Sequence, residues 1–131
     1  MKFGVQTSIT RKNAMPLLMH LFNKPNMIHL KDKVFGVFDQ TFSKKDPEGD
    51  YKWSTMRDLD RIWDDERCQK LKFNSSNTIV IDSEFCKVRE ILPNSIVVDP
   101  YQEIELLDEE KEDKTILGEL KEYMVELLGN A

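Results

Sequence analysis

The sequence has no long apolar segment and only two cysteines. No apolar run approaches the about 20 residues that a membrane-spanning helix needs, which excludes such a helix. Cys68 and Cys86 are too few for a disulfide framework, and neither stands at zinc-ligand spacing with His20 or His29. The two cysteines therefore predict free thiols in a reducing compartment.

Acidic residues are missing from the first 31 positions and concentrated near the other end of the chain. The net charge of the 131 residues is −5, and residues 103–113 contain seven acidic side chains against one basic one. We interpret this run as a solvated connector before a last helix, with a docking strip for a basic partner as the alternative. Because the chain is acidic overall, it lacks the positive surface that nucleic acids need, and no nucleic-acid partner is expected.

Four short segments are rich in the aromatic and β-branched residues that favour strands. They are residues 3–6, 34–38, 77–82 and 96–100. Helical patterns lie between them, and strands that alternate with helices are typical of a parallel sheet. We therefore predict an α/β fold in a single domain over residues 1–131, with a parallel sheet of about four strands flanked by helices.

The predicted helices have apolar residues at helical spacing. One follows Asn13, a candidate cap, and carries an apolar stripe over residues 14–22. After a polar loop at residues 43–51, residues 55–58 (TMRD) resemble a capping box that opens a second helix. The last helix is predicted over residues 114–128.

In open α/β sheets, functional side chains gather at the carboxyl ends of the strands. The polar residues expected there are Thr7, Ser8, Asp39, Thr41, Asp82, Ser83 and Asp99.

Four motifs follow one another in a recognisable order. Residues 3–14 (FGVQTSITRKNA) place a strand before small hydroxyls and Lys-Asn, and residues 57–63 (RDLDRIW) contain a basic residue before Asp-Leu. Residues 77–83 (NTIVIDS) form an Asn-Thr strand that ends in an acid, and residues 93–98 (PNSIVV) begin another strand. Together they resemble the FCP1-homology (NLI-interacting-factor-like) phosphatase domain of the haloacid dehalogenase superfamily, over roughly residues 3–128.

The resemblance implies a set of site residues. In that family one aspartate attacks phosphorus, a second acts as general acid and base, a hydroxyl and a lysine hold the phosphoryl oxygens, and acidic residues help to bind Mg²⁺. By resemblance, Thr7, Ser8 and Arg57 occupy phosphate-binding positions, and Asp82 and Ser83 occupy metal-site positions.

The first strand of the family, with its Asp-x-Asp-x-Thr motif, has no counterpart. The nearest lookalike, residues 37–41 (VFDQT), has Val37 where the nucleophile would stand. Arg57 replaces the family lysine, and Ser83 replaces the second acidic residue of the metal site. The resemblance thus implies an incomplete haloacid-dehalogenase-like (Rossmannoid) sheet that lacks its central first strand, with no catalytic residue, no metal and no cofactor.

Three functions fit these features. The favoured one is a noncatalytic pseudo-phosphatase that serves as a structural or interaction subunit of a larger assembly. The first alternative is the C-terminal half of a split Mg²⁺-dependent phosphoprotein (Ser/Thr) phosphatase, completed by a partner chain that supplies the nucleophilic aspartate. The second is a phosphopeptide-binding module. Mg²⁺ is expected only for the split phosphatase. In the family the missing strand lies between the strands that end here at Thr7 and Asp82, so we expect a protein partner to pair with the sheet edges left open there.

The N-terminal residues 2–22 are basic, bear hydroxyls and contain no acid, as in a mitochondrial transit peptide, but the same residues match the folded domain. We expect an intracellular protein, with the mitochondrion favoured over the nucleus.

Overall fold

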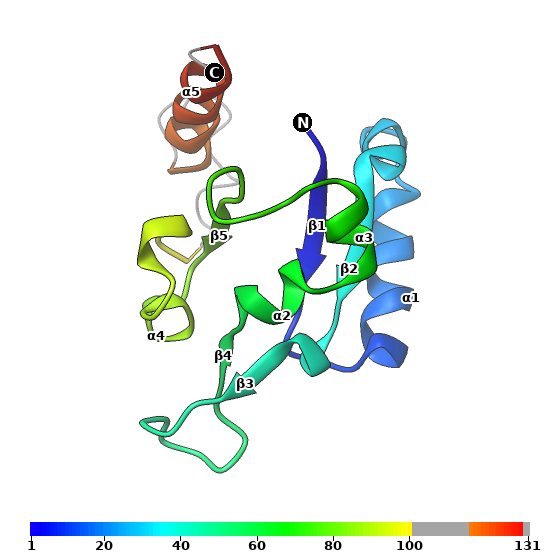
Figure 1. Cartoon of the computed structure of the whole chain (residues 1–131). Helices are drawn as coiled ribbons and strands as arrows, with labels where there is room; N and C mark the ends of the chain where they lie inside the picture. The colour runs from blue at the N-terminus through cyan, green and yellow to red at the C-terminus, as the bar shows by residue number, and fades with distance from the viewer. Residues whose placement is uncertain (101–115, 130–131) are drawn as a thin grey trace.

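The computed structural model describes residues 1–100 and 116–129, and these form a mixed α/β arrangement of short elements (Figure 1). Its helices are α1 (Arg11–Phe22), α2 (Leu59–Trp63), α3 (Glu66–Lys70), α4 (Phe85–Val88) and α5 (Ile116–Gly129), with 3-10 turns η1 (Ile28–Lys33), η2 (Gln40–Phe42) and η3 (Leu92–Asn94). The predicted connector at residues 103–113 lies outside the described residues, as does the start of the helix predicted over 114–128. None of the helices described has both the length and the hydropathy to cross a bilayer.

The strands of the described residues form three sheets of two strands each. Two are parallel pairs, β1 (Phe3–Gln6) with β2 (Val34–Phe38) and β5 (Val80–Asp82) with β6 (Ser95–Val97), and the third is an antiparallel hairpin of β3 (Ser43–Lys45) and β4 (Thr55–Arg57). The parallel pairing that the sequence predicts is thus present. A continuous sheet of about four strands is not, because within the described residues β1 pairs with β2 alone and β5 with β6 alone.

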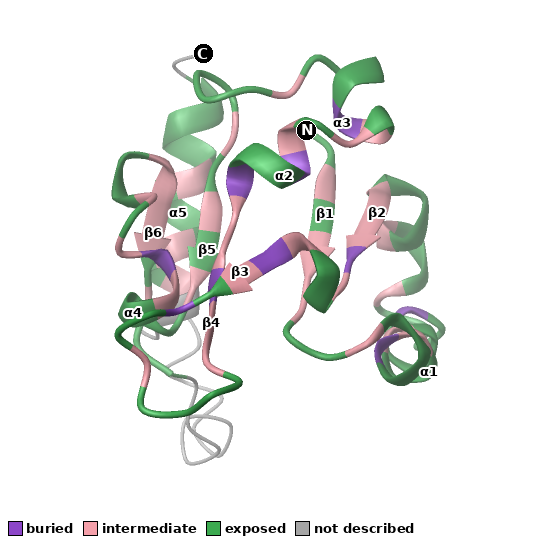
Figure 2. Ribbon diagram, turned by 60° about the horizontal axis from the view of Figure 1, so that its bottom comes forward, coloured by how far each residue is buried: buried purple, intermediate pink, exposed green. Residues whose placement is uncertain are grey.

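The two parallel pairs share one apolar core. Phe38 of β2 packs with Leu59 and Ile62 of α2 and with Cys68 of α3, and Val80 of β5 packs against the same cluster. Helices α2 and α3 therefore contribute to a core that both pairs share, and Figure 2 shows buried residues of both helices in purple. Helix α1 contacts the β1–β2 pair through the rings of Phe22 and Phe3, whose centroids are 6.5 Å apart.

The two cysteines are free thiols in different surroundings. Cys68 is 1% exposed within the core, and burial raises the pKa of its thiol, whereas Cys86 in α4 is exposed. The prediction that they form no disulfide is confirmed.

The predicted cap of the first helix was wrong. Helix α1 begins at Arg11, before Asn13, and its N-cap residue Thr10 makes no side-chain hydrogen bond. The Arg11 amide instead donates to Oδ2 of Asp39 (3.2 Å), so the carboxylate at the end of β2 satisfies the start of α1. Because the helix starts early, Pro16 lies in its interior rather than in its first turn.

The predicted capping box at residues 55–58 was also wrong, as was the loop at the start of residues 43–51. Ser43–Lys45 and Thr55–Arg57 pair as β3 and β4, which satisfies their backbone groups and buries Met56 at 1% exposure. The cap of α2 is Asp58, whose carboxylate accepts from the Arg61 amide (3.2 Å).

Candidate functional site

Three of the five site residues predicted by resemblance come together at the carboxyl ends of β1 and β5. Arg57, the last residue of β4, donates from Nε to Oδ2 of Asp82 (2.8 Å). Its Nη1 donates to Oγ of Ser8 (3.2 Å), two residues beyond β1. We call Ser8, Arg57 and Asp82 the Arg57 site.

The charged side chains of the Arg57 site are largely withdrawn from water. The Arg57 side chain is 12% exposed and that of Asp82 is 9% exposed. Charges buried to this extent are stable only when they are paired and hydrogen-bonded. The pair therefore depends on both partners being present.

Asp82 has no oxygen left without a partner. Its Oδ2 accepts from Arg57, and its Oδ1 accepts from the backbone amide of Glu84 (3.0 Å). A cation at this position would compete with the Arg57 guanidinium for the charge of Asp82. Within residues 1–100 and 116–129, no group of three His, Cys, Asp or Glu side chains could hold a metal ion.

The other two predicted positions lie beside the Arg57 site without joining it. Thr7 bonds locally, with its Oγ1 accepting from the Ile9 amide (3.3 Å) and its own amide donating to the Phe38 carbonyl (2.9 Å). Ser83 is exposed and makes no side-chain hydrogen bond to any described residue. The phosphate and metal positions implied by the resemblance are thus only partly assembled.

The polar residues that follow β2, Asp39 and Thr41, have a structural role. Asp39 accepts from the Thr41 hydroxyl (2.6 Å), the Thr41 amide (3.0 Å) and the Arg11 amide. These donors, led by the Thr41 hydroxyl, lower the pKa of Asp39. Asp39 is therefore the cap that joins β2 to α1 and η2.

Among the residues that the structure describes, two buried polar atoms near the Arg57 site have no hydrogen-bond partner. They are Nε2 of Gln6, the last residue of β1, and Oγ of Ser43, which pairs with Arg57 across the hairpin. Buried polar groups without a partner are rare and call for an explanation. Neither residue stands out in a sequence motif, so no sequence pattern could have indicated these two atoms.

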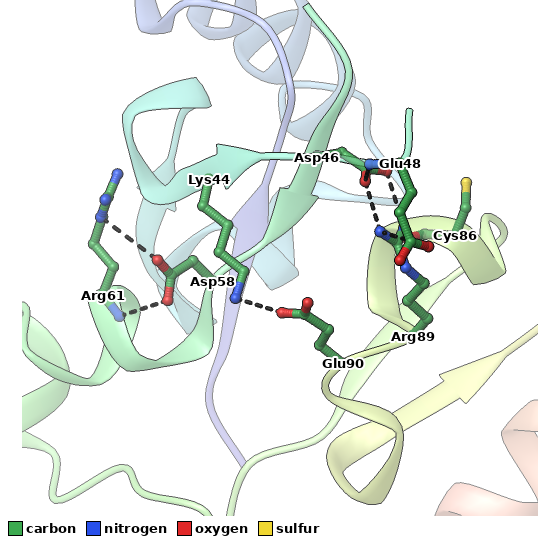
Figure 3. Close-up of polar contacts among 8 residues, drawn as sticks. All are labelled: Lys44, Asp46, Glu48, Asp58, Arg61, Cys86, Arg89 and Glu90. Carbon is green, nitrogen blue, oxygen red and sulfur yellow. Dashed lines mark hydrogen bonds and ion pairs between the residues drawn. The ribbon is translucent and has the colours of Figure 1, made fainter. Parts of the chain in front are cut away.

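A second buried ion pair fixes the hairpin loop to α4 (Figure 3). Arg89 donates from Nη2 to Oδ1 (2.6 Å) and from Nη1 to Oδ2 (2.9 Å) of Asp46, and from Nη1 to the Cys86 carbonyl. These bonds lower the pKa of Asp46, which is 7% exposed, to about 2. Lys44 and Glu90 form a further ion pair between the same two segments (2.5 Å).

Comparison with known proteins adds no relative: no protein-family model, curated protein or solved structure matches the chain.

Proposed function

We propose that this chain is a noncatalytic, pseudo-phosphatase-like interaction subunit of a larger protein assembly. The observation that carries the proposal is the Arg57–Asp82 ion pair. The two charged groups at the phosphate-binding and metal-site positions neutralise each other, and Asp82 has both oxygens engaged. The Arg57 site therefore links β4 to β5 structurally and is not open to a phosphate or a metal ion.

Residues 37–41, the segment most similar to the nucleophile motif, have structural roles. Val37 lies within β2 and pairs with Val5 of β1, and Asp39 caps the neighbouring helices. Valine has no nucleophilic atom, and an aspartate held by three donors is a poor one. Both observations favour a noncatalytic role for residues 37–41.

The separated strand pairs favour a protein partner. Within the described residues, β1 and β5 each pair on one side only. Unpaired edges are templates for association with another chain, and such pairing satisfies their backbone groups. The proposed assembly would complete one sheet from the two existing pairs and a strand of the partner.

Phosphopeptide binding has weaker support. An open pocket of about 410 Å³ lies beside Arg57, but Asp58, Asp60 and Glu90 also line it. These three carboxylates outnumber the two cations of the lining, Lys44 and Arg57, so the charge of the pocket opposes the binding of a phosphate.

Native purification from the source cells, followed by mass spectrometry and a phosphatase assay, tests the proposal. We expect a complex that shows no Mg²⁺-dependent hydrolysis of an aryl phosphate, with the Asp82→Asn chain as the matched control. Turnover by the isolated chain would contradict the proposal. A partner with an Asp-x-Asp-x-Thr strand, and turnover that needs its first aspartate, would establish the split phosphatase instead.

We also propose an intracellular location, with the mitochondrion favoured over the nucleus. Residues 2–22 carry the basic character of a transit peptide, yet they form β1 and α1. Removal of these residues would take away a strand and a helix, so we expect a protein that keeps them. Mass measurement of the chain from fractionated cells tests both points, and a shortened mitochondrial form would contradict the second.

A further inference from the structure

We propose that the partner inserts one extended strand between β1 and β5, parallel to both, and that this strand carries a hydrogen-bond acceptor side chain near Gln6 and Ser43. The inference rests on the proposed function and adds the chemistry of the partner's segment.

The position of the inserted strand follows from the two parallel pairs, β1–β2 and β5–β6, which we call the half-sheets. Ser8 follows the end of β1, Asp82 ends β5, and the single side chain of Arg57 contacts both. The carboxyl ends of the two strands are therefore close together, and both strands run in the same direction (Figure 1). Within residues 1–100 and 116–129, β1 is bonded to β2 alone and β5 to β6 alone, so each offers its other edge to a newcomer.

The direction of the strand follows from its neighbours. Both existing pairs are parallel, and sheets of purely parallel strands are over-represented in proteins. A parallel newcomer would end beside the Arg57 site, where β1 and β5 also end.

One face of the inserted strand would meet an apolar layer. Leu59 and Ile62 of α2 pack with Phe38 of one pair, and Val80 of the other pair packs on the same cluster. Parallel sheets are buried on both faces and are rich in aliphatic side chains. The strand is therefore expected to be mainly aliphatic.

The orphaned atoms specify one polar position. Gln6 pairs with Phe38 in the register of β1 and β2, so its side chain is on the same face as Phe38, the face that α2 covers. The unpartnered Nε2 of Gln6 is a donor and therefore needs an acceptor, while the hydroxyl of Ser43 can donate or accept. An acceptor near the carboxyl end of the inserted strand, on its α2 side, would satisfy both.

A tethered strand tests the inference on the full chain. We would fuse before Met1 a strand of about seven residues, made of valine and threonine with one asparagine near its carboxyl end. A Gly-Ser linker of about 15 residues is long enough for a parallel crossover. Residue-resolved hydrogen exchange should slow at least about tenfold at backbone amides of both β1 and β5, because both gain a neighbour.

Matched controls separate insertion from a general effect of the fusion. A version with two prolines in the strand cannot complete the ladder and should give no slowing. Equal slowing with the proline version, or no slowing in either β1 or β5, would overturn the insertion.

A double-mutant cycle tests the acceptor. Changing the strand's asparagine to leucine should reduce the protection about fivefold in the natural chain, the worth of one hydrogen bond, and have little effect in the Gln6→Leu chain. Gln6→Leu should itself fold, because it removes a buried donor that has no partner. Equal losses in both chains would overturn the acceptor.

These outcomes leave the proposed function separately testable. If no strand inserts, the further inference fails and the proposed noncatalytic function stands. If the isolated chain turns over substrate, the proposed function fails whether or not a strand inserts.

Discussion

Two arginine–aspartate pairs link distant parts of this chain, and they differ in what remains when one carboxylate is lost. Arg89 holds Asp46 with two parallel hydrogen bonds and also lies 3.6 Å from an oxygen of Glu48. The Arg57 guanidinium holds Asp82 with one hydrogen bond, and its other side-chain hydrogen bond among the described residues goes to the hydroxyl of Ser8. The first pair has a reserve carboxylate, and the second has none.

We call the Arg89–Asp46 pair the clamp and the Arg57–Asp82 pair the junction. The Arg89 pair ties one hairpin loop to one helix, so its geometry can be strong and redundant. The Arg57 pair joins the ends of two half-sheets through a single carboxylate. The proposed partner strand would therefore lie beside the Arg57–Asp82 pair, the one without a second carboxylate to replace Asp82.

The largest effect is expected from Asp82→Ala. This change leaves the Arg57 guanidinium buried without a counter-charge, which costs about 3 to 5 kcal/mol of unfolding free energy. Urea unfolding followed by tryptophan fluorescence measures it. The double variant Arg57→Leu with Asp82→Val is the control, and it should recover much of the loss because no charge stays buried. A loss below about 1 kcal/mol in Asp82→Ala would contradict the description of the pair as buried.

A smaller loss is expected from Asp46→Asn, because Glu48 can still approach Arg89. This variant also tests pH dependence. The pKa of Asp46 is about 2 in the folded chain and near 3.8 in the unfolded chain, so its stabilisation is complete above about pH 4 and is lost as the pH falls towards 2. Urea midpoints between pH 5 and about pH 2 should fall less steeply in Asp46→Asn than in the natural chain. Identical slopes would contradict the prediction.

Lysine substitutions sharpen the comparison further. An ammonium cannot form two parallel bonds to a carboxylate. Arg89→Lys should therefore lower the urea midpoint more than Arg57→Lys, which we expect to cost about 1 kcal/mol. The reverse order would show that the Arg57 pair is the more demanding in geometry.

The smallest effect is expected from Ser8→Ala. It removes one exposed hydrogen bond to Arg57, worth about 0.5 kcal/mol, and keeps the ion pair. Thr41→Ala is a contrasting control, because it removes the 2.6 Å bond to Asp39 that supports the start of α1. Thermal unfolding of the two variants gives the order, and an equal or larger loss in Ser8→Ala would contradict it.

The sequence predicted the elements that depend on local apolar pattern. The strands at residues 3–6 and 34–38 have the predicted bounds, whereas those predicted at residues 77–82 and 96–100 are shorter, at Val80–Asp82 and Ser95–Val97. Ser8, Arg57 and Asp82 were grouped by the resemblance alone, and the structure brings these three side chains together. The sequence did not predict the pairing of the hairpin strands. Ser43–Lys45 is too polar to resemble a strand, and it is ordered by its partner Thr55–Arg57.

Long-range hydrogen bonds account for the other differences. The cap of α1 comes from Asp39, 28 positions beyond Arg11, and the clamp joins residues 43 positions apart. Local rules for caps and loops cannot anticipate such partners, because they compare only near neighbours in the sequence. The missing central strand that the resemblance implies stays a prediction, because the described residues show only separate two-stranded sheets.

The contrast between the two thiols gives the chain a built-in attachment point. A maleimide dye reacts with thiolates, so it should modify Cys86 and spare Cys68, whose thiol is sealed in the core. The dye would sit three residues from Arg89, whose guanidinium holds the Cys86 carbonyl. A single fluorophore could thus follow the loosening of the clamp without any engineered cysteine.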